Sequence, residues 1–423
     1  MKTQKQSLFR RDFTMVVIGQ IISLFGNAIL RFALPLYLLR ETGSSTLFGA
    51  VTACPFIPMI LFSLVGGVWA DRLNKRNVMV VLDFTTAVLI LVFYGLNGQV
   101  PIVPLILVFL MLLYGISGAY QPTVQASIPA LVQRERIMQG NAVINMVNTL
   151  SGLLGPVIGG VLFGAWGITP ILLLSIGCFF CSAVMEIFIH IPYQKQPMQA
   201  GILRVMKQDW QESGRFVKRE KPIFLSVVIV LALFNLVLSA AILVGIPIMV
   251  VNVLDMSDAS LGLTQGALGL GGLAGGCLGG VVGEKIKLRH GSRLLLFCSL
   301  TAALMGAALL PFVPPFAGYV LITAMSFAMM AASTLFSIQL CTVVQQQTPA
   351  YLVGKIMACM MAIANCATPL GQAVYGVLFD VCATVPWLVM FGSAAIAFLI
   401  SLYSKNVFVR LEKENVCDAE VLP

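Results

Sequence analysis

A short pattern of glycine, an acid and a base occurs twice in this chain, each time at the end of an apolar segment. Residues 66–76 read GGVWADRLNKR and residues 279–285 read GGVVGEK, with a glycine four positions before the acid in both. A carboxylate so placed can accept hydrogen bonds from the first amides of a neighbouring helix, where the dipole favours negative charge. The pattern predicts a latch between helices; a solvated turn is the alternative, which the second copy disfavours. The predicted latch comprises Gly67, Asp71, Arg72, Arg76, Gly280, Glu284 and Lys285.

Polar side chains also recur at helical spacing inside long apolar segments. The first segment carries Gln20, Ser23, Asn27 and Arg31 at spacings of three, four and four residues. Because polar groups are costly to bury in hydrocarbon, such faces are expected to point into the protein or a water-filled cavity. Hydrogen bonding between helices is the alternative, and the pattern leaves both open. The predicted cavity residues are Gln20, Asn27, Arg31, Gln121, Asn145, Asn148, Asn235, Asn365 and Gln372.

Ionisable residues within the apolar segments are few. Arg31 falls in the outer third of its segment, where it either reaches the outer surface or meets an anionic or carbonyl-bearing substrate. Asp83 and Glu186 fall near the inner ends of theirs, where solvation is the simpler expectation. Either acid is also a candidate for binding a coupling proton. No pattern in the sequence predicts a metal site.

Long helices are needed to position these residues, and the composition supplies them. Hydrophobic residues make up 59% of the 423, charged residues only 10%, and the mean hydropathy is +0.95. A soluble domain is nearer half apolar and a quarter charged. A membrane-crossing helix needs about 20 apolar residues. Twelve segments are candidates: 13–39, 46–70, 78–96, 102–121, 140–163, 168–190, 223–250, 261–283, 294–313, 317–338, 355–379 and 385–403.

The basic residues predict the orientation of these segments. With a cytoplasmic N-terminus and twelve spans, 24 of the 26 Lys and Arg residues fall on the cytoplasmic side, and only Arg31 and Arg40 fall elsewhere. This is the positive-inside distribution, which accounts for the net charge of +9 without a nucleic-acid partner. Both termini are therefore expected in the cytoplasm. The first apolar segment is too long for a signal peptide.

The fifth segment has a face of small residues. Glycines at helical spacing allow two helices to approach closely, and a proline removes a backbone hydrogen bond. The face favours a helix that packs tightly in one state and separates in another, over ordinary close packing. The corresponding stretch of the eleventh segment keeps Gly371 but lacks the other glycines. This predicts that the fifth helix packs more closely on its neighbour, forming the tighter seam. The motif comprises Gly152, Gly155, Pro156, Gly159 and Gly160.

The longest hydrophilic stretch divides the chain into two similar halves. Matching motifs recur 213 to 216 positions apart, which predicts an all-α membrane protein of twelve transmembrane helices arranged as two parallel six-helix repeats. The expected parts are an N-terminal bundle (1–190), an amphipathic cytoplasmic linker (191–222) and a C-terminal bundle with a short tail (223–423). No extramembrane part is large enough for a catalytic domain, and no phosphate-binding loop occurs. Neither an enzyme nor a cofactor is expected.

At this point the chain resembles the major facilitator superfamily over nearly its whole length. Gly67, Asp71, Arg72, Lys75 and Arg76 match the family's loop 2–3 motif, although Asn74 stands where a glycine is usual. The fifth-segment glycines and proline match the motif of the family's exporters. Residues 125–143, QASIPALVQRERIMQGNAV, resemble the branch of macrolide-efflux and siderophore-export proteins.

The resemblance implies a mechanism and a direction of transport. It implies that Asp71 meets the start of the eleventh span, near Lys355, in one of two alternating states, and that the first, fourth, seventh and tenth spans line the cavity. Many proton-coupled relatives carry an acid directly after the glycine of the first span, whereas here Asn27 follows Gly26. The function expected is export of small amphipathic molecules across the cell membrane by a monomer, driven by protons or another coupling ion. An importer or lipid or nutrient permease is the alternative, and a membrane-embedded sensor or enzyme a remote one.

The latch hypothesis makes a prediction about Asp71. Asp71→Asn is expected to insert into the membrane normally but to transport poorly, because the amide carries no charge to hold a helix N-terminus. Surface expression and substrate flux in cells measure the two properties separately. Wild-type flux at equal expression would reduce Asp71 to a residue that only fixes topology.

Overall fold

The computed structural model describes residues 10–133, 136–191, 217, 221–282, 291–348 and 352–421, and their regular structure is helical. In the first half of the chain the helices are α1 (Arg11–Thr42), α2 (Ser45–Ala53), α3 (Phe56–Arg72), α4 (Lys75–Leu96), α5 (Ile102–Leu131), α6 (Ile137–Trp166) and α7 (Ile168–Ile187). In the second half they are α9 (Ile223–Phe234), the π-helical η2 (Asn235–Ser239), η3 (Ala241–Gly245) and η4 (Ile248–Val253), then α10 (Asp258–Val282), α11 (Gly291–Ala307), α12 (Pro315–Gln346), α13 (Val353–Val381) and α14 (Trp387–Val421).

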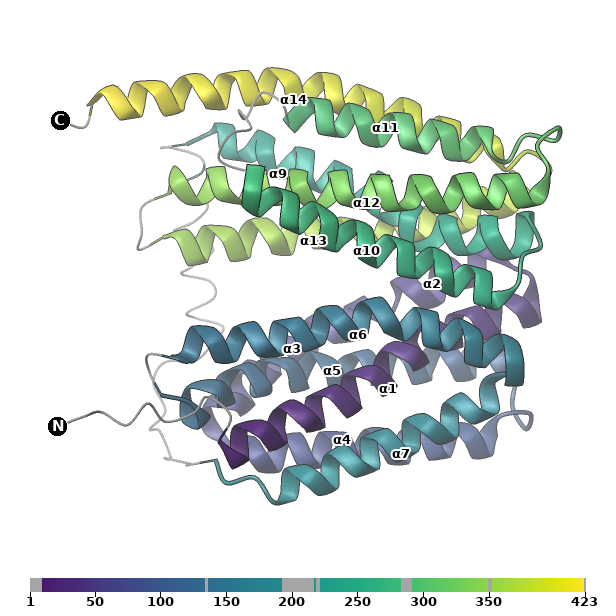
Figure 1. The fold of residues 1–423 in the computed structure, drawn as a ribbon, viewed down its shortest axis with the longest axis vertical. Coiled ribbons are helices and arrows are strands. Elements are labelled where there is room, and N and C mark those ends of the chain that lie inside the picture. Colours follow the sequence, from purple (N-terminus) through teal and green to yellow (C-terminus); the bar gives the residue numbers. More distant parts are fainter. Residues whose placement is uncertain are drawn as a thin grey trace. The chain divides into compact units, whose positions relative to one another are not determined.

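The chain forms two compact units. The first comprises Met1–Gly43 and Cys54–Gln199, and the second comprises Ser44–Ala53 and Ala200–Pro423. Within each unit the helices run side by side as a bundle (Figure 1). The helix α2 precedes α3 in the chain but packs against α13, so that it belongs to the second unit.

The predicted membrane spans correspond to the observed helices. Eleven helical segments in the described part of the chain are long and apolar enough to cross a membrane, and the seventeen-residue α11 supplies a shorter twelfth. The predicted span 46–70 is not one continuous helix, because α2 ends at Ala53 and α3 begins at Phe56. Pro55 lies in this break and has no amide hydrogen to continue the helical ladder. The predicted fold class is confirmed.

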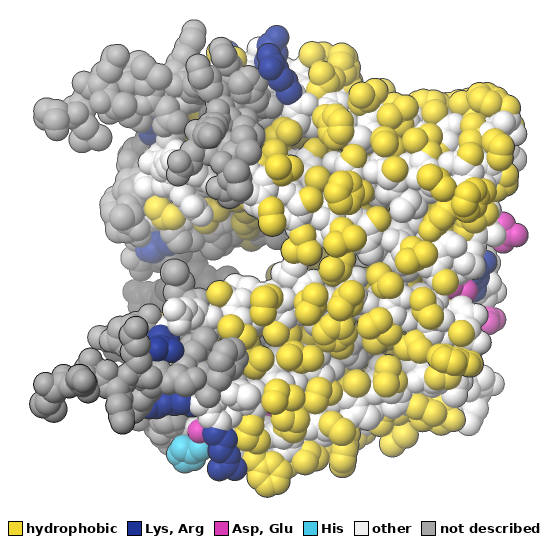
Figure 2. Space-filling view, in the orientation of Figure 1, with side chains coloured by type: hydrophobic (Ala, Val, Ile, Leu, Met, Phe, Trp, Pro, Cys, Tyr) yellow, Lys and Arg dark blue, Asp and Glu magenta, His cyan; other side chains and the backbone are white. Residues whose placement is uncertain are grey.

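On the face seen in Figure 2, hydrophobic side chains cover the long sides of both bundles, and the charged side chains visible there lie near the bundle ends. Exposed apolar residues such as Leu61, Val81, Leu173 and Leu399 would be unfavourable in water. They suit a hydrocarbon environment, where apolar groups face outward and polar groups turn inward.

Close backbone contacts hold neighbouring helices together in the first unit. In α6, Gly155 lies against Ala28 of α1 so closely that a Cβ would overlap it, and a Cβ on Gly159 would lie 3.0 Å from the Phe32 ring. Gly152 on the same helix faces open space. The predicted small-residue face therefore does pack against another helix, but through Gly155 and Gly159 and not through Gly152.

The contact between α1 and α7 combines small residues with hydrogen bonds. Ser182 donates to the carbonyl of Gly19 (3.2 Å), and Ser175 donates to the carbonyl of Gly26 (3.3 Å). Gly26 faces Cys178, whose Cβ would be only 2.9 Å from an added Cβ. Small residues thus bring the two backbones close enough for serine hydroxyls to reach across.

Equivalent helices of the two units pack in the same way. Gly118 of α5 lies against the carbonyl of Met59 in α3, and Gly275 of α10 lies against the carbonyl of Ala331 in α12. An added Cβ would overlap the carbonyl oxygen in both places. The second and fourth spans of each sequence repeat therefore share one mode of contact.

The sequence predicts closer helix packing at the fifth span than at the eleventh. This prediction is wrong for Gly159 and Gly371. A Cβ on Gly371 would overlap the carbonyl oxygen of Leu236 and lie 2.6 Å from the Cβ of Ala240. At Gly159 the nearest atom belongs to the Phe32 side chain, which can move. The eleventh span has fewer glycines than the fifth, which suggested looser packing there. The space around a single glycine depends instead on how near the backbone of the partner helix lies.

These contacts predict unequal tolerance of alanine. Gly371→Ala should lower the melting temperature of the purified protein, since overpacking against a backbone typically destabilises by ~1–3 kcal/mol. Gly159→Ala should have a smaller effect because a side chain can yield. Gly152→Ala is the matched control, and a helical alanine in open space should be neutral or stabilising. Equal melting temperatures for the Gly371 and Gly152 variants would contradict the close contact between Gly371 and the backbone of Leu236.

Candidate functional site

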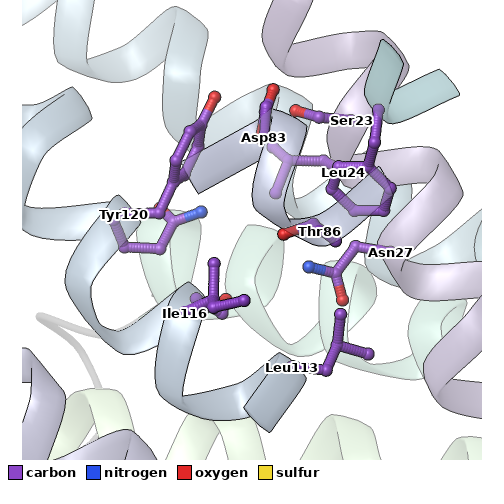
Figure 3. A pocket seen from close by; sticks show the side chains of 11 residues that line it. Ser23, Leu24, Asn27, Asp83, Thr86, Leu113, Ile116 and Tyr120 are labelled. Carbon is purple, nitrogen blue, oxygen red and sulfur yellow. The ribbon is translucent and has the colours of Figure 1, made fainter. Parts of the chain in front are cut away.

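Polar side chains from four helices of the first unit meet in its interior. Gln20 on α1 donates from Nε2 to the hydroxyl of Tyr120 on α5 (2.6 Å). The same hydroxyl donates to Oε1 of Glu186 on α7 (2.7 Å). Asp83 on α4 completes the cluster beside Tyr120 (Figure 3). One tyrosine hydroxyl thus joins three helices through two short hydrogen bonds.

Both acids of this cluster are buried. The exposed fraction is 2% for Asp83 and 1% for Glu186. The expectation that they are solvated at the inner ends of their spans is therefore wrong. Asp83, in the third turn of α4, and Glu186, in the last turn of α7, lie on faces that pack on other helices, and the sequence position alone did not reveal those faces. Buried carboxylates in membrane helices are costly and mark functional sites.

A small cavity adjoins Asp83. Its volume is about 20 Å³, and its polar lining includes Ser23, Asn27, Thr86 and Gln121 (Figure 3). A space of this size takes one water-sized species. It is far too small for the pocket of a drug-sized ligand, which is typically about 300–1,000 Å³. The cavity therefore suits an ion or a water molecule.

Arg31 lies further along α1, and two of its three guanidinium nitrogens are buried although the residue is partly exposed. The Cζ atom sits 3.8 Å from the centre of the Tyr114 ring, which is a cation–π contact. The Nε and Nη2 atoms are buried and have no hydrogen-bond partner among the described residues. The side chain therefore does not extend to the outer surface, and two of its donors remain available to an acceptor.

The remaining predicted cavity residues do not join this site. Asn145 and Asn365 are exposed. Asn148 donates to the Ile144 carbonyl of its own helix, and Asn235 donates to the Ala364 carbonyl of α13. Gln372 is buried in the second unit, with its Oε1 atom unpaired among the described residues. Of the predicted set, the structure gathers Gln20, Asn27 and Gln121 around one cluster.

Two residues of the predicted latch, Glu284 and Lys285, lie outside the described residues. Gly67, Asp71, Arg72 and Gly280 lie in described helices, but their surroundings are not described. Arg76 is described at the start of α4, where its amide donates to the side chain of Asn74 (3.1 Å). Asn74, which departs from the family's glycine, thus serves as the N-cap of this helix.

Two important residues escaped the sequence analysis. Tyr120 was missed because the polar face of its span was assigned to Gln121 and the residues at helical spacing from it. A tyrosine deep in an apolar span, whose hydroxyl needs a partner there, was the signal that could have indicated it. Asp380, at the end of α13, accepts from the amides of Ser45 and Thr46 (both 2.8 Å) at the start of α2. An acid directly after an apolar segment was the signal there, and the contact is the anion–helix chemistry expected of Asp71.

The sequence of this chain is similar to those of known transport proteins. A sequence model described as Major Facilitator Superfamily matches residues 16–371. Macrolide efflux protein A of Streptococcus pyogenes is 22% identical over 405 residues, covering 94% of this chain and 96% of that protein. Enterobactin exporter EntS of Salmonella typhimurium is 24% identical over 369 residues, covering 86% of this chain and 84% of the relative.

Solved transporters share the fold at lower identity. A bacterial homologue of the iron transporter ferroportin, in an inward-facing state, has a TM-score of 0.71 and 18% identity, covering 96% of this chain and all (100%) of the other. The peptide transporter POT in complex with sulfate has a TM-score of 0.74 and 12% identity, covering 97% of each chain.

The hydrogen-bond chain predicts the effect of removing one hydroxyl. Tyr120→Phe should lower the melting temperature, because it leaves Gln20 Nε2 and Glu186 Oε1 buried without partners, at ~1–3 kcal/mol for an unsatisfied group. Tyr94→Phe is the control, since Tyr94 is 40% exposed on α4. Equal thermal unfolding of the two variants in detergent would show that the cluster does not stabilise the bundle.

Proposed function

Because this chain belongs to the major facilitator superfamily, we propose that it exports small amphipathic molecules across the cell membrane by alternating access. The names of two relatives that span most of its length describe macrolide efflux and enterobactin export. The fifth-span motif supports the same direction through Gly155 and Gly159, which pack α6 on α1. The transport class follows from the family, and the direction and substrate class are proposals.

The observation that carries the substrate class is the guanidinium of Arg31. A buried cation with unpaired donors is unfavourable unless an acceptor satisfies it, and hydrogen bonds to charged groups are worth ~1.5–3 kcal/mol. Tyr114 covers one face of the guanidinium, which leaves its edge for hydrogen bonds. A substrate with a carboxylate, phenolate or carbonyl oxygen and an apolar body fits this pair of side chains.

The proposed topology follows from the distribution of basic residues. Two six-helix repeats (1–190 and 223–423) are joined by a basic linker (191–222), with both termini in the cytoplasm. The linker lies almost entirely outside the described residues. Repeats related in this way supply the two halves that alternating access requires.

Vesicles of opposite orientation test the direction and the role of Arg31 together. Inverted vesicles containing the wild type should accumulate a radiolabelled macrolide under an imposed ion gradient, and Arg31→Gln should reduce both binding and accumulation. The amide keeps a polar side chain but removes the charge and the planar donor fork. Arg11→Gln is the matched control, an exposed arginine on the same helix.

Two results would contradict the proposal. Net accumulation by the wild type in right-side-out vesicles would replace export with import. Unchanged affinity in Arg31→Gln, at equal protein in the membrane, would show that the guanidinium has only a structural role beside Tyr114.

A further inference from the structure

Several oxygen atoms around Asp83 have no hydrogen-bond partner among the described residues. They include Oδ2 of Asp83 and Oγ of Ser23, and Oδ1 of Asn27 is also unpaired, although its amide turns the nitrogen toward Thr86 (Figure 3). Ser23 is 97% buried, being only 3% exposed. Its hydroxyl points toward the carboxylate of Asp83 (Figure 3). An unpaired buried oxygen is costly, and a group of them around one space indicates a ligand that accepts electron pairs.

The charge of the cluster also lacks a positive counterpart among the residues that the structure describes. The described groups that interact with Asp83 and Glu186 are Ser182, Tyr120 and the carboxylates themselves. None of these is a cation. Two carboxylates in a low-dielectric interior must be neutralised by protons or by a bound cation. Glu186 is turned toward Tyr120 and does not line the cavity, so that one carboxylate faces it.

The neutral oxygens distinguish a cation from a proton. A proton on Asp83 would remove the charge, but a water molecule would then also be needed to satisfy the oxygens of Ser23 and Asn27, whereas one cation can contact all three residues. A small metal cation binds several oxygens at once, and hydroxyl, amide and carboxylate oxygens are the ligands of hard cations. Thr86 donates its hydroxyl to Leu82, which leaves its oxygen lone pairs free to face the cavity. Turning the Asn27 amide over would present Oδ1 on the Thr86 side without a change in volume.

Charge and space select the ion. With Asp83 facing the cavity as a carboxylate and Glu186 neutralised by a proton, a monovalent cation gives a neutral site. Among the described residues, no three His, Cys, Asp or Glu side chains gather as a divalent or transition-metal site would favour. The volume of about 20 Å³ admits a dehydrated ion and excludes its full hydration shell.

We propose that Asp83, Ser23, Asn27 and Thr86 bind one dehydrated sodium ion between α1 and α4. The site would supply the coupling ion of the proposed transport function, on which this role rests. Binding itself needs no substrate and is measured independently of direction. A failure of export with intact sodium binding would therefore refute the proposed function alone.

Sodium-dependent stability tests the site in the full-length protein. The melting temperature is measured while choline chloride is replaced by NaCl at constant ionic strength and pH. The wild type should show a saturable rise, since a ligand that binds only the folded state stabilises it by mass action. KCl should give a smaller rise, because the larger potassium ion keeps its charge farther from the Asp83 carboxylate and is attracted less strongly. Equilibrium binding of ²²Na⁺ provides a second measurement.

Two variants and one control locate the ion. Asp83→Asn should abolish the sodium-dependent rise, and Ser23→Ala should shift it to higher concentrations, by roughly tenfold or more as for other metal-supporting residues. Thr85→Ala is the control, since Thr85 is exposed on α4 and its hydroxyl bonds only to the Val81 carbonyl among the described residues. It should keep the wild-type response.

Three outcomes would overturn the proposal. One is equal melting in sodium, potassium and choline salts together with no specific ²²Na⁺ binding. Another is stabilisation by acid alone, which would assign the cluster to protons. The third is stabilisation by Ca²⁺ at micromolar concentration without a response to sodium. If Asp83→Asn does not fold, Ser23→Ala and isotope binding to the wild type still decide.

Discussion

The absence of water inside a membrane is the constraint on which the rest of this structure depends. A polar group within a span must find its partner in the protein, because hydrocarbon offers none. The serines of α7 meet this requirement by donating to carbonyls of α1, and Asp380 meets it by accepting amides at the start of α2. Tyr120 meets it for two neighbours at once. Where the requirement is not met within the described residues, a bound ion or a bound water molecule supplies the missing partner.

Close packing and polar satisfaction are linked through glycine. Gly19 allows α7 to approach α1, so that Ser182 reaches its carbonyl and the Cγ atom of Glu186 lies 3.9 Å from where a Cβ would stand. The same approach brings Glu186 within reach of Tyr120. An alanine at Gly19 would make only ordinary contacts, whereas a side chain longer than alanine would disturb both the helix contact and the position of a buried acid.

The first unit separates two kinds of recognition along one helix. Arg31 and Tyr114 present a buried cation and an aromatic face, which together suit an amphipathic molecule. One to two turns away, Ser23 and Asn27 face a space for a single ion. Both sites lie on α1, so a movement of this helix would alter both. That arrangement is a physical basis for coupling an ion to a substrate, provided the two ligands favour different states of the unit.

The sequence by itself determined the twelve spans and the fold class, because hydropathy and repeat spacing are properties of the chain that hold before any helix meets another. It also indicated Gln20, Asn27 and Gln121 as inward-facing, since polar residues in a span avoid lipid. It did not reveal that Asp83 and Glu186 are buried together, that Tyr120 links its own helix to two others, or that Gly371 has less room than Gly159. Those features depend on which helix faces which and at what distance. Only the tertiary structure decides this, because the partner atoms come from residues far away in the chain.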